Sequence, residues 1–325
     1  MVLNFFKSFL SRPALLVNKV VDLPVLSERD LDELAVVLAD IFHGHSLKRL
    51  LNPKASESIK QGEQASRYLG TGMEYEESRA YHVGDEVRRI NWRLMARTGK
   101  AFTKLFQEER QESWTVLLDK RQAMRFGTRR QLKVQQAIKA MGFFVWQAEK
   151  LGLPVELVSM DKEVKTSPTY EGKGAFEHLM RLANTPCPPI KFVKNEQESS
   201  LNDELIACQK RLQVGSRLIV VSDLHDMDDK TLMLLAGLQQ RVMVKVVLIF
   251  DEVEKKLPVL SGLKLRALNG SDEVGLSSQQ LQSYERWAEG YFSNLTGRLL
   301  SVGVRVQMLS TTDDLNKLTD FGAGE

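Results

Sequence analysis

The sequence predicts an α/β protein with a mostly parallel sheet, preceded by a helix and a small β-hairpin layer. Short apolar segments rich in Val, Ile and Leu, most clearly 217–222 and 244–250, are typical of strands buried on both faces. Segments with helical periodicity separate these strands, as in sheets covered by helices on both sides. Asp119, Asp223 and Asp251 each follow an apolar segment directly, at the point where the strand is expected to end.

The composition fits a globular protein of one large domain or two smaller ones. The chain has 325 residues, of which 43% are hydrophobic and 27% charged, so a substantial core can be buried. The formal net charge of +3 creates no global field that would recruit nucleic acid. Two cysteines, Cys187 and Cys208, do not indicate a disulfide framework, which favours a reducing compartment. No apolar run reaches the roughly 18 residues that span a bilayer.

The N-terminal segment Met1–Val21 alternates apolar residues with Lys7, Arg12 and Lys19. Two interpretations remain open. A helix packed on the domain, or a frayed end, is favoured over an interfacial helix on an anionic membrane leaflet.

The first helix is expected over Glu28–Phe42, where Ser27 and Asp30 resemble a capping box and Gly44 provides a stop. Its apolar face comprises Leu31, Leu34, Val37, Leu38 and Ile41. Residues 52–72 are polar and predict a loop. Residues 73–81 and 101–106 predict extended strands, with a turn at 82–85.

From Trp114 the pattern alternates between strands and helices. Strands are predicted at 114–118, 153–160, 217–222, 244–250 and 304–309, and helices at 131–150, 175–183, 201–212, 230–240 and 281–300. The change in pattern places a boundary near Gln111. Three parts follow: an amphipathic segment 1–25, a helix-plus-hairpin region 26–110 and an α/β domain 111–325.

Several local patterns suggest functional sites. His43 and His45 are better explained by a helix end than by a metal site. Gly172, Lys173 and Gly174 precede a helix and suggest an anion site, although a simple loop is favoured. Asp223 and His225 follow a strand and suit acid–base chemistry, but the sequence identifies no nucleophile for a hydrolase. Neither a P-loop nor a Gly-x-Ser-x-Gly motif is present.

The segment 88–104 contains six basic residues and no acid, with Trp92 and Phe102 interleaved. Such a segment would suit a phosphate backbone with stacked bases. The favoured alternative is an intramolecular network in which nearby carboxylates pair with the arginines and clamp the hairpin onto the sheet. Those carboxylates are Asp85, Glu86, Glu108, Glu109 and Glu112.

A motif that spans this region and the strand after it resembles the domain of unknown function 58 family. The motif comprises Arg79, Tyr81, Gly84, Asp85, Arg88, Ile90, Asn91, Trp92, Ala96, Arg97, Lys104 and Glu108, ahead of the strand that ends at Leu118 and Asp119. A second block comprises Phe250, Asp251, Glu254, Leu257, Pro258 and Gly262. The resemblance covers about Leu26–Phe321, and we interpret the motif as structural.

The resemblance implies a von Willebrand factor A-like domain of Rossmann type. Such domains hold a metal ion at the strand ends through an Asp-x-Ser-x-Ser loop and a later Asp, because Mg²⁺ prefers hard oxygen ligands. Asp119 and Asp223 match the two aspartates, whereas Arg121 and Ala123 replace the serines. We therefore expect no complete Mg²⁺ site and no other cofactor. Arg121 is expected to pair with Asp119 or Asp223, or Asp119 simply caps the next segment.

Family members are commonly encoded beside MoxR-type AAA+ ATPases and are thought to assemble or remodel other proteins with them. Many carry two N-terminal transmembrane helices, which this sequence does not predict. The expectation is a cytoplasmic, non-enzymatic adaptor, peripheral to the membrane at most through Met1–Val21. Partner contacts are expected in the loops 119–126, 223–229 and 172–176. The candidate residues are Asp119, Arg121, Asp223, His225 and Asp226. Nucleic-acid binding through 88–104 and an unrecognised hydrolase are the alternatives.

Overall fold

The computed structural model describes ten ranges of the chain. They are 24–43, 69–70, 74–82, 87–107, 112–128, 130–187, 198–258, 264–266, 273–275 and 277–322. Expectations for Met1–Val21, Gly44, His45, Gly84, Asp85, Glu86, Glu108 and Glu109 lie outside them. The chain divides into two compact units, one formed by Met1–Pro53 with Glu112–Glu325 and the other by Lys54–Gln111.

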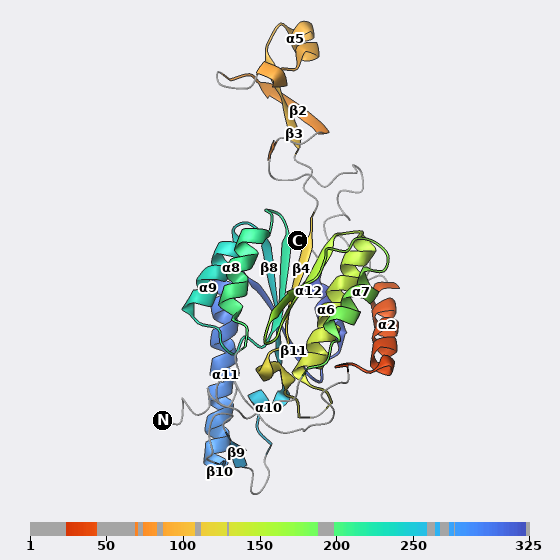
Figure 1. Ribbon diagram of the computed structural model, residues 1–325. Coiled ribbons are helices and arrows are strands. Elements are labelled where there is room, and N and C mark those ends of the chain that lie inside the picture. Colours follow the sequence, from red (N-terminus) through yellow and green to blue (C-terminus); the bar gives the residue numbers. More distant parts are fainter. Residues whose placement is uncertain are drawn as a thin grey trace. The chain divides into compact units, whose positions relative to one another are not determined.

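The larger unit is built on a six-stranded sheet with the order β11-β8-β7-β4-β5-β6 (Figure 1). The strands are β4 (Trp114–Asp119), β5 (Val155–Met160), β6 (Val164–Thr166), β7 (Arg217–Ser222), β8 (Met243–Phe250) and β11 (Arg305–Ser310). All neighbouring pairs are parallel except β5 and β6 at one edge. Every residue of β4 and β7 is buried, which explains their continuous apolar sequence. The predicted α/β class is confirmed.

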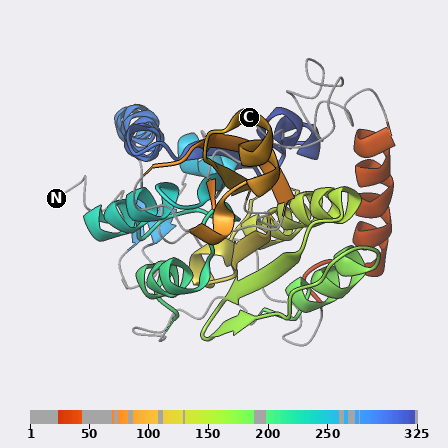
Figure 2. The same ribbon diagram turned by 90° about the horizontal axis from the view of Figure 1, so that it is seen from above.

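Helices cover both faces of the sheet (Figure 2). On one face lie α2 (Glu28–His43), α6 (Lys133–Leu151), α7 (Ala175–Ala183), η3 (Leu315–Leu318) and α12 (Thr319–Gly322). On the other lie α8 (Leu201–Arg211), α9 (Asp229–Gln239) and α11 (Ser278–Ser301). Shorter elements are η2 (Gln122–Arg125), α10 (Glu252–Lys255) and the antiparallel pair β9 (Lys264–Arg266) and β10 (Glu273–Gly275). Two clusters of buried apolar side chains fill the two layers.

The strand order changes direction between β4 and β7. From β4 the chain continues through α6 to β5, and from β7 it continues through α9 to β8, on the opposite side. In open α/β sheets, ligands bind at the carboxyl ends of the two strands that flank such a switch point. Asp119 ends β4 and Asp223 follows β7. The topology therefore brings these two aspartates to one place.

Helix α2 belongs to the sheet unit, which differs from the predicted region 26–110. Leu34 and Leu38 are buried in the cluster that contains the α6 side chains. Gly142 on α6 permits this close approach, because a β-carbon there would lie 3.3 Å from Leu34 Cδ2. The Asn184 side chain also binds the backbone of Leu26 through two hydrogen bonds of 2.6 and 3.0 Å. The division before the first strand of the sheet falls between Gln111 and Glu112.

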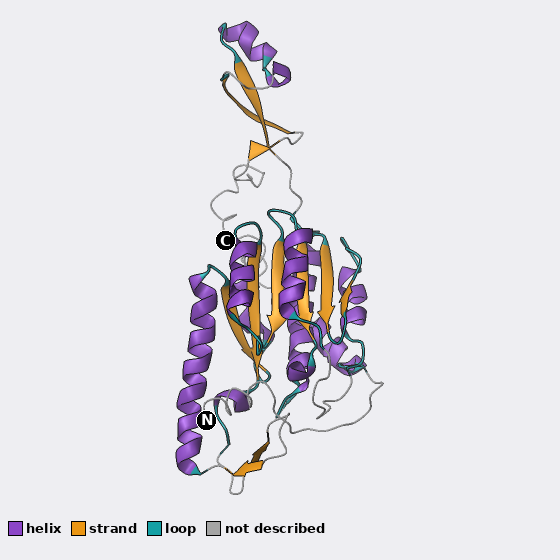
Figure 3. Ribbon diagram, turned by 60° about the vertical axis from the view of Figure 1, so that its left-hand side comes forward, coloured by secondary structure: helices purple, strands orange, loops and turns teal. Residues whose placement is uncertain are grey.

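The smaller unit is an antiparallel sheet with a short helix (Figure 3). Its strands are β1 (Leu69–Gly70), β2 (Glu74–Ala80) and β3 (Phe102–Gln107), in the order β1-β3-β2. Along the chain, η1 (Val87–Arg89) and α5 (Trp92–Thr98) connect β2 to β3. Strand β1 lies in a segment that the sequence predicts to be a loop, and α5 is a helix that the sequence analysis does not predict. The caps of α5 were present as a signal, since Asn91 Oδ1 accepts from Leu94 N at 3.1 Å and Gly99 has φ +68°.

Residues of the family motif differ in their surroundings. Asn91 is buried, and its Nδ2 donates to Ser78 Oγ at 3.0 Å, which ties α5 to β2. Arg79 Nη1 donates to the Ala80 carbonyl at 3.1 Å, and Tyr81 is half-buried. The expected pairing of Glu112 with the motif arginines is wrong. Its carboxylate lies 2.9 Å from Arg217 Nη2 and accepts from Trp114 Nε1 at 2.8 Å, both in the sheet unit.

Among the described helices, none combines the length and the apolar composition needed to cross a membrane.

The docking of α2 is testable through its buried face. Leu38→Ala should lower the free energy of unfolding of the sheet unit by about 2–5 kcal/mol, because it opens a cavity against α6. Val36 on the same helix is 61% exposed. Val36→Ala should change the free energy of unfolding by less than about 0.5 kcal/mol. Urea denaturation followed by circular dichroism measures both, and equal effects would contradict the docked position.

Candidate functional site

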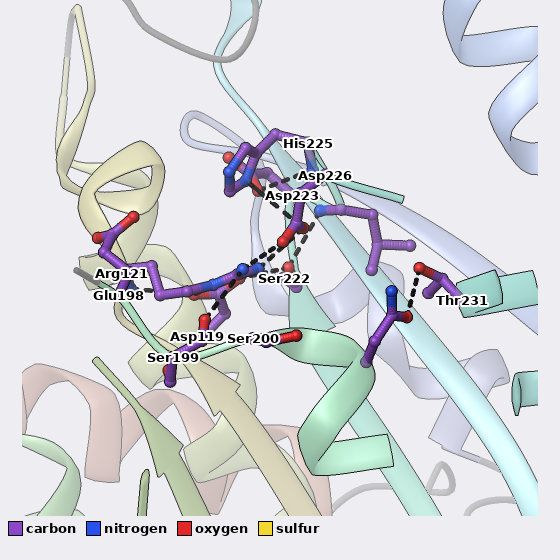
Figure 4. A network of polar contacts seen from close by, with 12 residues as sticks. Asp119, Arg121, Glu198, Ser199, Ser200, Ser222, Asp223, His225, Asp226 and Thr231 are labelled. Carbon is purple, nitrogen blue, oxygen red and sulfur yellow. Dashed lines mark hydrogen bonds and ion pairs between the residues drawn. The ribbon is translucent and has the colours of Figure 1, made fainter. Parts of the chain in front are cut away.

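The candidate site is a group of charged side chains at the carboxyl ends of β4, β7 and β8, which we call the strand-end cluster. It comprises Asp119, Arg121, Lys133, Asp223, His225, Asp226 and Glu254. Figure 4 shows how Asp119 and Arg121 approach the segment Ser222–Asp226 from the neighbouring strand end. Residues far apart in the sequence meet here because β4 and β7 are adjacent and parallel.

The Arg121 guanidinium is the central group. Nε donates to Asp119 Oδ1 at 3.0 Å, and Nη2 donates to Asp119 Oδ2 at 2.8 Å. Nη2 also donates to Asp226 Oδ1 at 3.0 Å, while Nη1 donates to Asp226 Oδ2 and to the Ser199 carbonyl at 3.5 Å. All five N–H groups therefore have acceptors. Burial opposes the charge, yet the two carboxylates raise the pKa of Arg121.

Asp119 has a second role besides its ion pair. Oδ1 accepts from the backbone N–H of Arg121 at 2.9 Å, and Oδ2 accepts from Ser222 Oγ at 2.7 Å. Ser222 Oγ in turn accepts from Leu224 N at 3.0 Å. Asp119 therefore pairs with Arg121 and also caps the segment after β4, so both alternatives for this residue hold. The carboxylate joins the loop after β4 to the end of β7.

Lys133 neutralises the other aspartate. It begins α6 and is fully buried, with Nζ 2.7 Å from Asp223 Oδ2 and 2.7 Å from Glu254 Oε1. Burial opposes the ammonium charge, but the two carboxylates raise its pKa. Burial also raises the pKa of Glu254 to about 7, partly offset by Lys133. Asp223 thus pairs with Lys133. The alternative from the sequence, in which Asp223 pairs with Arg121, is wrong.

His225 completes the loop after β7. Its Nδ1 lies 2.9 Å from Asp223 Oδ1, which also accepts from the His225 backbone N–H at 3.2 Å. Burial lowers the pKa of His225, but the carboxylates of Asp223 and Asp226 outweigh it and raise the pKa. The turn is strained, because the buried Leu224 has φ +50°. After this turn, Asp226 pairs with Arg121 and the His225 ring pairs with Asp223.

A third loop joins the cluster immediately before α8. Glu198 Oε1 accepts from the backbone N–H of Gln122, and the Ser199 carbonyl accepts from Arg121. Burial raises the pKa of Glu198, although Arg121 lies near enough to oppose the shift. The Arg121 guanidinium therefore connects three loops, which follow β4, follow β7 and precede α8.

The third loop of the sequence hypothesis, 172–176, lies elsewhere. Phe176 N donates to Glu149 Oε2 at 2.8 Å, near the carboxyl end of α6, whereas Lys133 at the amino end of that helix touches the cluster. Loop 172–176 is therefore excluded from the candidate site. Gly174, with φ +95°, serves as the N-cap residue of α7.

Two other predicted residues bring no polar group to the cluster. Ala123 is buried in η2 and offers no side-chain oxygen. His43 Nδ1 lies 2.5 Å from the Ala39 carbonyl, so the ring is hydrogen-bonded to the backbone at the end of α2. Both positions are explained by local structure.

Sequence reasoning missed Lys133, Ser222, Glu198 and the contribution of Glu254 to the site. The only sequence signal for Lys133 is weak: it is a cation next to an apolar position of the predicted helix 131–150. Glu254 belonged to the second family block, but its partner lies 121 positions earlier in the chain. Pairing over such separations is decided only by the fold.

The side chains present do not fit Mg²⁺. Asp119 and Asp223 are the carboxylates that a metal would need, and each already accepts hydrogen bonds from a buried cation. Arg121 places a fixed positive charge beside them, and Ala123 supplies no ligand. Within the described ranges, no group of three His, Cys, Asp or Glu side chains is placed to hold a metal ion.

A family model described as "Protein of unknown function DUF58" matches residues 77–291. The chain belongs to this family. The match takes in most of β2, all of α5 and β3, and the sheet from β4 to β8, so the resemblance carried by the two motif blocks is confirmed. No curated protein matches the chain.

Solved structures of similar fold have low sequence identity. The conserved hypothetical protein BatB from Bacteroides thetaiotaomicron is 11% identical with a TM-score of 0.41, over 65% of this chain and 96% of that one. An aerotolerance-related membrane protein from Bacteroides fragilis, mutated to serine at multiple positions, has 11% identity, a TM-score of 0.40 and the same coverage. A von Willebrand factor type A protein from Catenulispora acidiphila has 7% identity and a TM-score of 0.33, over 67% and 44% of the two chains.

Protonation of His225 should stabilise the fold. Its pKa is raised on folding, so the stabilisation is fully present below the unfolded pKa of about 6.5 and is lost as the pH rises through the folded pKa. The stability difference between wild type and His225→Gln should be larger at about pH 5.5 than at about pH 8.5. Urea denaturation at the two pH values measures it.

The surrounding charges provide the control for this experiment. Asp223 and Asp226 favour the charged ring, whereas Arg121 opposes it. In an Asp226→Asn background, the pH-dependent part of the difference should therefore shrink. A difference that is the same at both pH values would contradict the assigned partners of His225.

Proposed function

We propose that this protein is a non-enzymatic protein-binding module whose recognition surface is formed by the loops around the strand-end cluster. One observation carries the proposal. A single buried guanidinium, with every donor engaged, fixes three loops at the switch point of the sheet. A surface held in this way is preorganised, which lowers the entropic cost of binding a partner.

Arg121 acts in this proposal as an internal lock. Its side chain is only 3% exposed and has no free donor, so a partner cannot reach it without breaking the cluster. The accessible groups are instead Asp226, with 37% side-chain exposure, and His225, with 18%. The recognition role that the sequence hypothesis gave to Arg121 therefore passes to the rim of the cluster.

Among the described residues no nucleophile is paired with His225, which favours binding over catalysis. A hydrolase would need a hydroxyl or thiol within hydrogen-bond reach of the ring. Ser222 lies close in sequence, but its hydroxyl donates to Asp119. Among the described residues, the only side chains paired with His225 Nδ1 are the carboxylates of Asp223 and Asp226. This set orients an imidazole without giving it a proton to abstract.

We take a MoxR-type AAA+ ATPase as the first partner, in the assembly or remodelling of other proteins in the cytoplasm. The basis is the family relationship, since members are commonly encoded beside such ATPases. A nucleic-acid partner at the strand-end cluster is disfavoured, because the exposed Asp226 carboxylate repels phosphates.

The lock makes metal binding unnecessary. Calorimetry should show no micromolar binding of Mg²⁺ or Mn²⁺ to the wild-type protein. In Arg121→Ser/Ala123→Ser, loss of the buried cation should cost about 3–5 kcal/mol of stability. Added Mg²⁺ should restore part of it, because the new hydroxyls and Asp119 supply oxygen ligands. Micromolar binding to wild type that Asp119→Ala abolishes would refute the proposed lock.

Capture by the ATPase tests the recognition surface. Immobilised MoxR-type ATPase from the same genome should bind the wild-type chain, and Asp226→Asn should weaken binding about tenfold, as for one interface hot spot. Asp32→Asn on the exposed face of α2 makes the same charge change far from the cluster in sequence and should leave capture unchanged. Equal capture of all three proteins would remove the strand-end loops from the interface.

A further inference from the structure

The smaller unit exposes two large apolar side chains that lie five positions apart in the sequence. Trp92, the first residue of α5, is 58% exposed, and Val87 in η1 is 59% exposed. Buried or half-buried positions are usual for a tryptophan in a folded domain. Neither the strand-end cluster nor the family motif as a structural clamp explains this exposure. The exposure of Trp92 and Val87 therefore suggests a further role for this part of the smaller unit.

The geometry of α5 places cations on the same face as the tryptophan. At about 100° per residue, Trp92, Arg93, Ala96 and Arg97 fall within an arc of about 140°. The burial pattern agrees, because these four residues are exposed whereas Leu94 and Met95 on the other side are half-buried. The helix thus presents an aromatic ring and two guanidiniums together to solvent.

Further exposed basic residues flank α5 in the sequence. Arg88 and Lys100 are also exposed, and the segment 87–107 contains no acidic residue. In the described part of the chain, the side chains of Arg88, Arg93, Arg97 and Lys100 form no ion pair and no hydrogen bond. Four solvated cations with two apolar side chains define a surface complementary to a layer of anionic groups.

We propose that this surface, the α5 face, binds lipid bilayers that carry anionic headgroups. The α5 face comprises Val87, Arg88, Trp92, Arg93, Arg97 and Lys100. Tryptophan prefers the headgroup level of a bilayer, where its ring is apolar and its N–H is solvated. Lysine and arginine near an anionic bilayer each strengthen binding about fivefold. Val87 supplies a second apolar contact with the acyl boundary.

The observations favour lipid over the two macromolecular alternatives. A stable protein interface uses about 20–30 residues on each side, whereas the described α5 face is a single short helix with its preceding turn. Single-stranded nucleic acid is bound on platforms where successive bases stack on several aromatic rings. Among the residues whose side-chain exposure is described in this segment (87–88 and 90–103), Trp92 is the only exposed aromatic, and Phe102 is half-buried. One ring beside four cations matches the interfacial chemistry of a membrane.

Vesicle co-sedimentation of the full-length chain tests the proposal. Vesicles of phosphatidylcholine and phosphatidylglycerol in equal amounts should bind the protein, and vesicles of pure phosphatidylcholine should not. Arg93→Glu/Arg97→Glu should weaken binding at least about 25-fold, from two lost cations alone. Trp92→Ala should also weaken it, and added salt should lower the affinity because the attraction is screened.

Matched controls separate the α5 face from net charge and from stability. Arg29 on α2 and Arg181 on α7 are 87% and 71% exposed, so Arg29→Glu/Arg181→Glu makes the same change in net charge on the sheet unit. This control should bind anionic vesicles as wild type does. Thermal unfolding of each variant shows that it is folded. The strand-end cluster is intact in all of them, so ATPase capture reports on the other proposal independently.

Three outcomes overturn the proposal. Absence of binding to anionic vesicles does so directly. Equal binding by wild type, Trp92→Ala and Arg93→Glu/Arg97→Glu would assign any membrane contact to another part of the chain. Salt-sensitive binding to a single-stranded oligonucleotide, lost in the α5 variants without vesicle binding, would assign the face to nucleic acid.

Discussion

The arrangement at the strand ends depends on the ion pairs of one buried guanidinium. Arg121 lies between two carboxylates, Asp119 at the end of β4 and Asp226 in the loop after β7. A buried, unpaired charge is strongly destabilising, so each partner holds the others in place. The planar fork of arginine suits this role, because two carboxylates can each accept a pair of nearly parallel hydrogen bonds. These hydrogen bonds hold the loops after β4, after β7 and before α8 in fixed positions.

A guanidinium and a metal ion differ in whether they leave a binding position open for a partner protein. A metal site keeps a coordination position that a partner's carboxylate can fill. Arg121 has five donors, and all five are used within the chain. The second cation, Lys133, similarly binds Asp223 and Glu254. The same strand ends thus become a closed ionic network, and any recognition must use the groups at its rim.

The smaller unit presents the opposite kind of electrostatics. Its α5 face carries an exposed ring and cations that have no ion-pair partner among the described residues, whereas the strand-end cluster neutralises its charges internally. The two surfaces belong to different compact units of the chain. A module with two chemically distinct surfaces could hold a protein partner and a membrane surface through separate contacts.

The sequence alone determined the fold class and the family. The continuous apolar strands, the helical periodicity and the motif residues are local patterns, and burial of β4 and β7 on both faces produces them directly. It also indicated Asp119, Arg121 and Asp223, because strand ends in parallel sheets meet at one edge. Helix α5 was missed since one short helix has little periodicity, although its caps at Asn91 and Gly99 were visible.

Only the tertiary structure decided which charges pair. Arg121 had two candidate aspartates in the sequence, and it binds one of them together with Asp226, while Lys133 takes the other. The choice depends on side-chain reach and on the strained turn at Leu224, neither of which a pattern of residue types contains. The same holds for α2, whose apolar face predicts burial but not its neighbour. Local sequence fixes periodicity and residue chemistry, whereas long-range contacts arise only when the chain is folded.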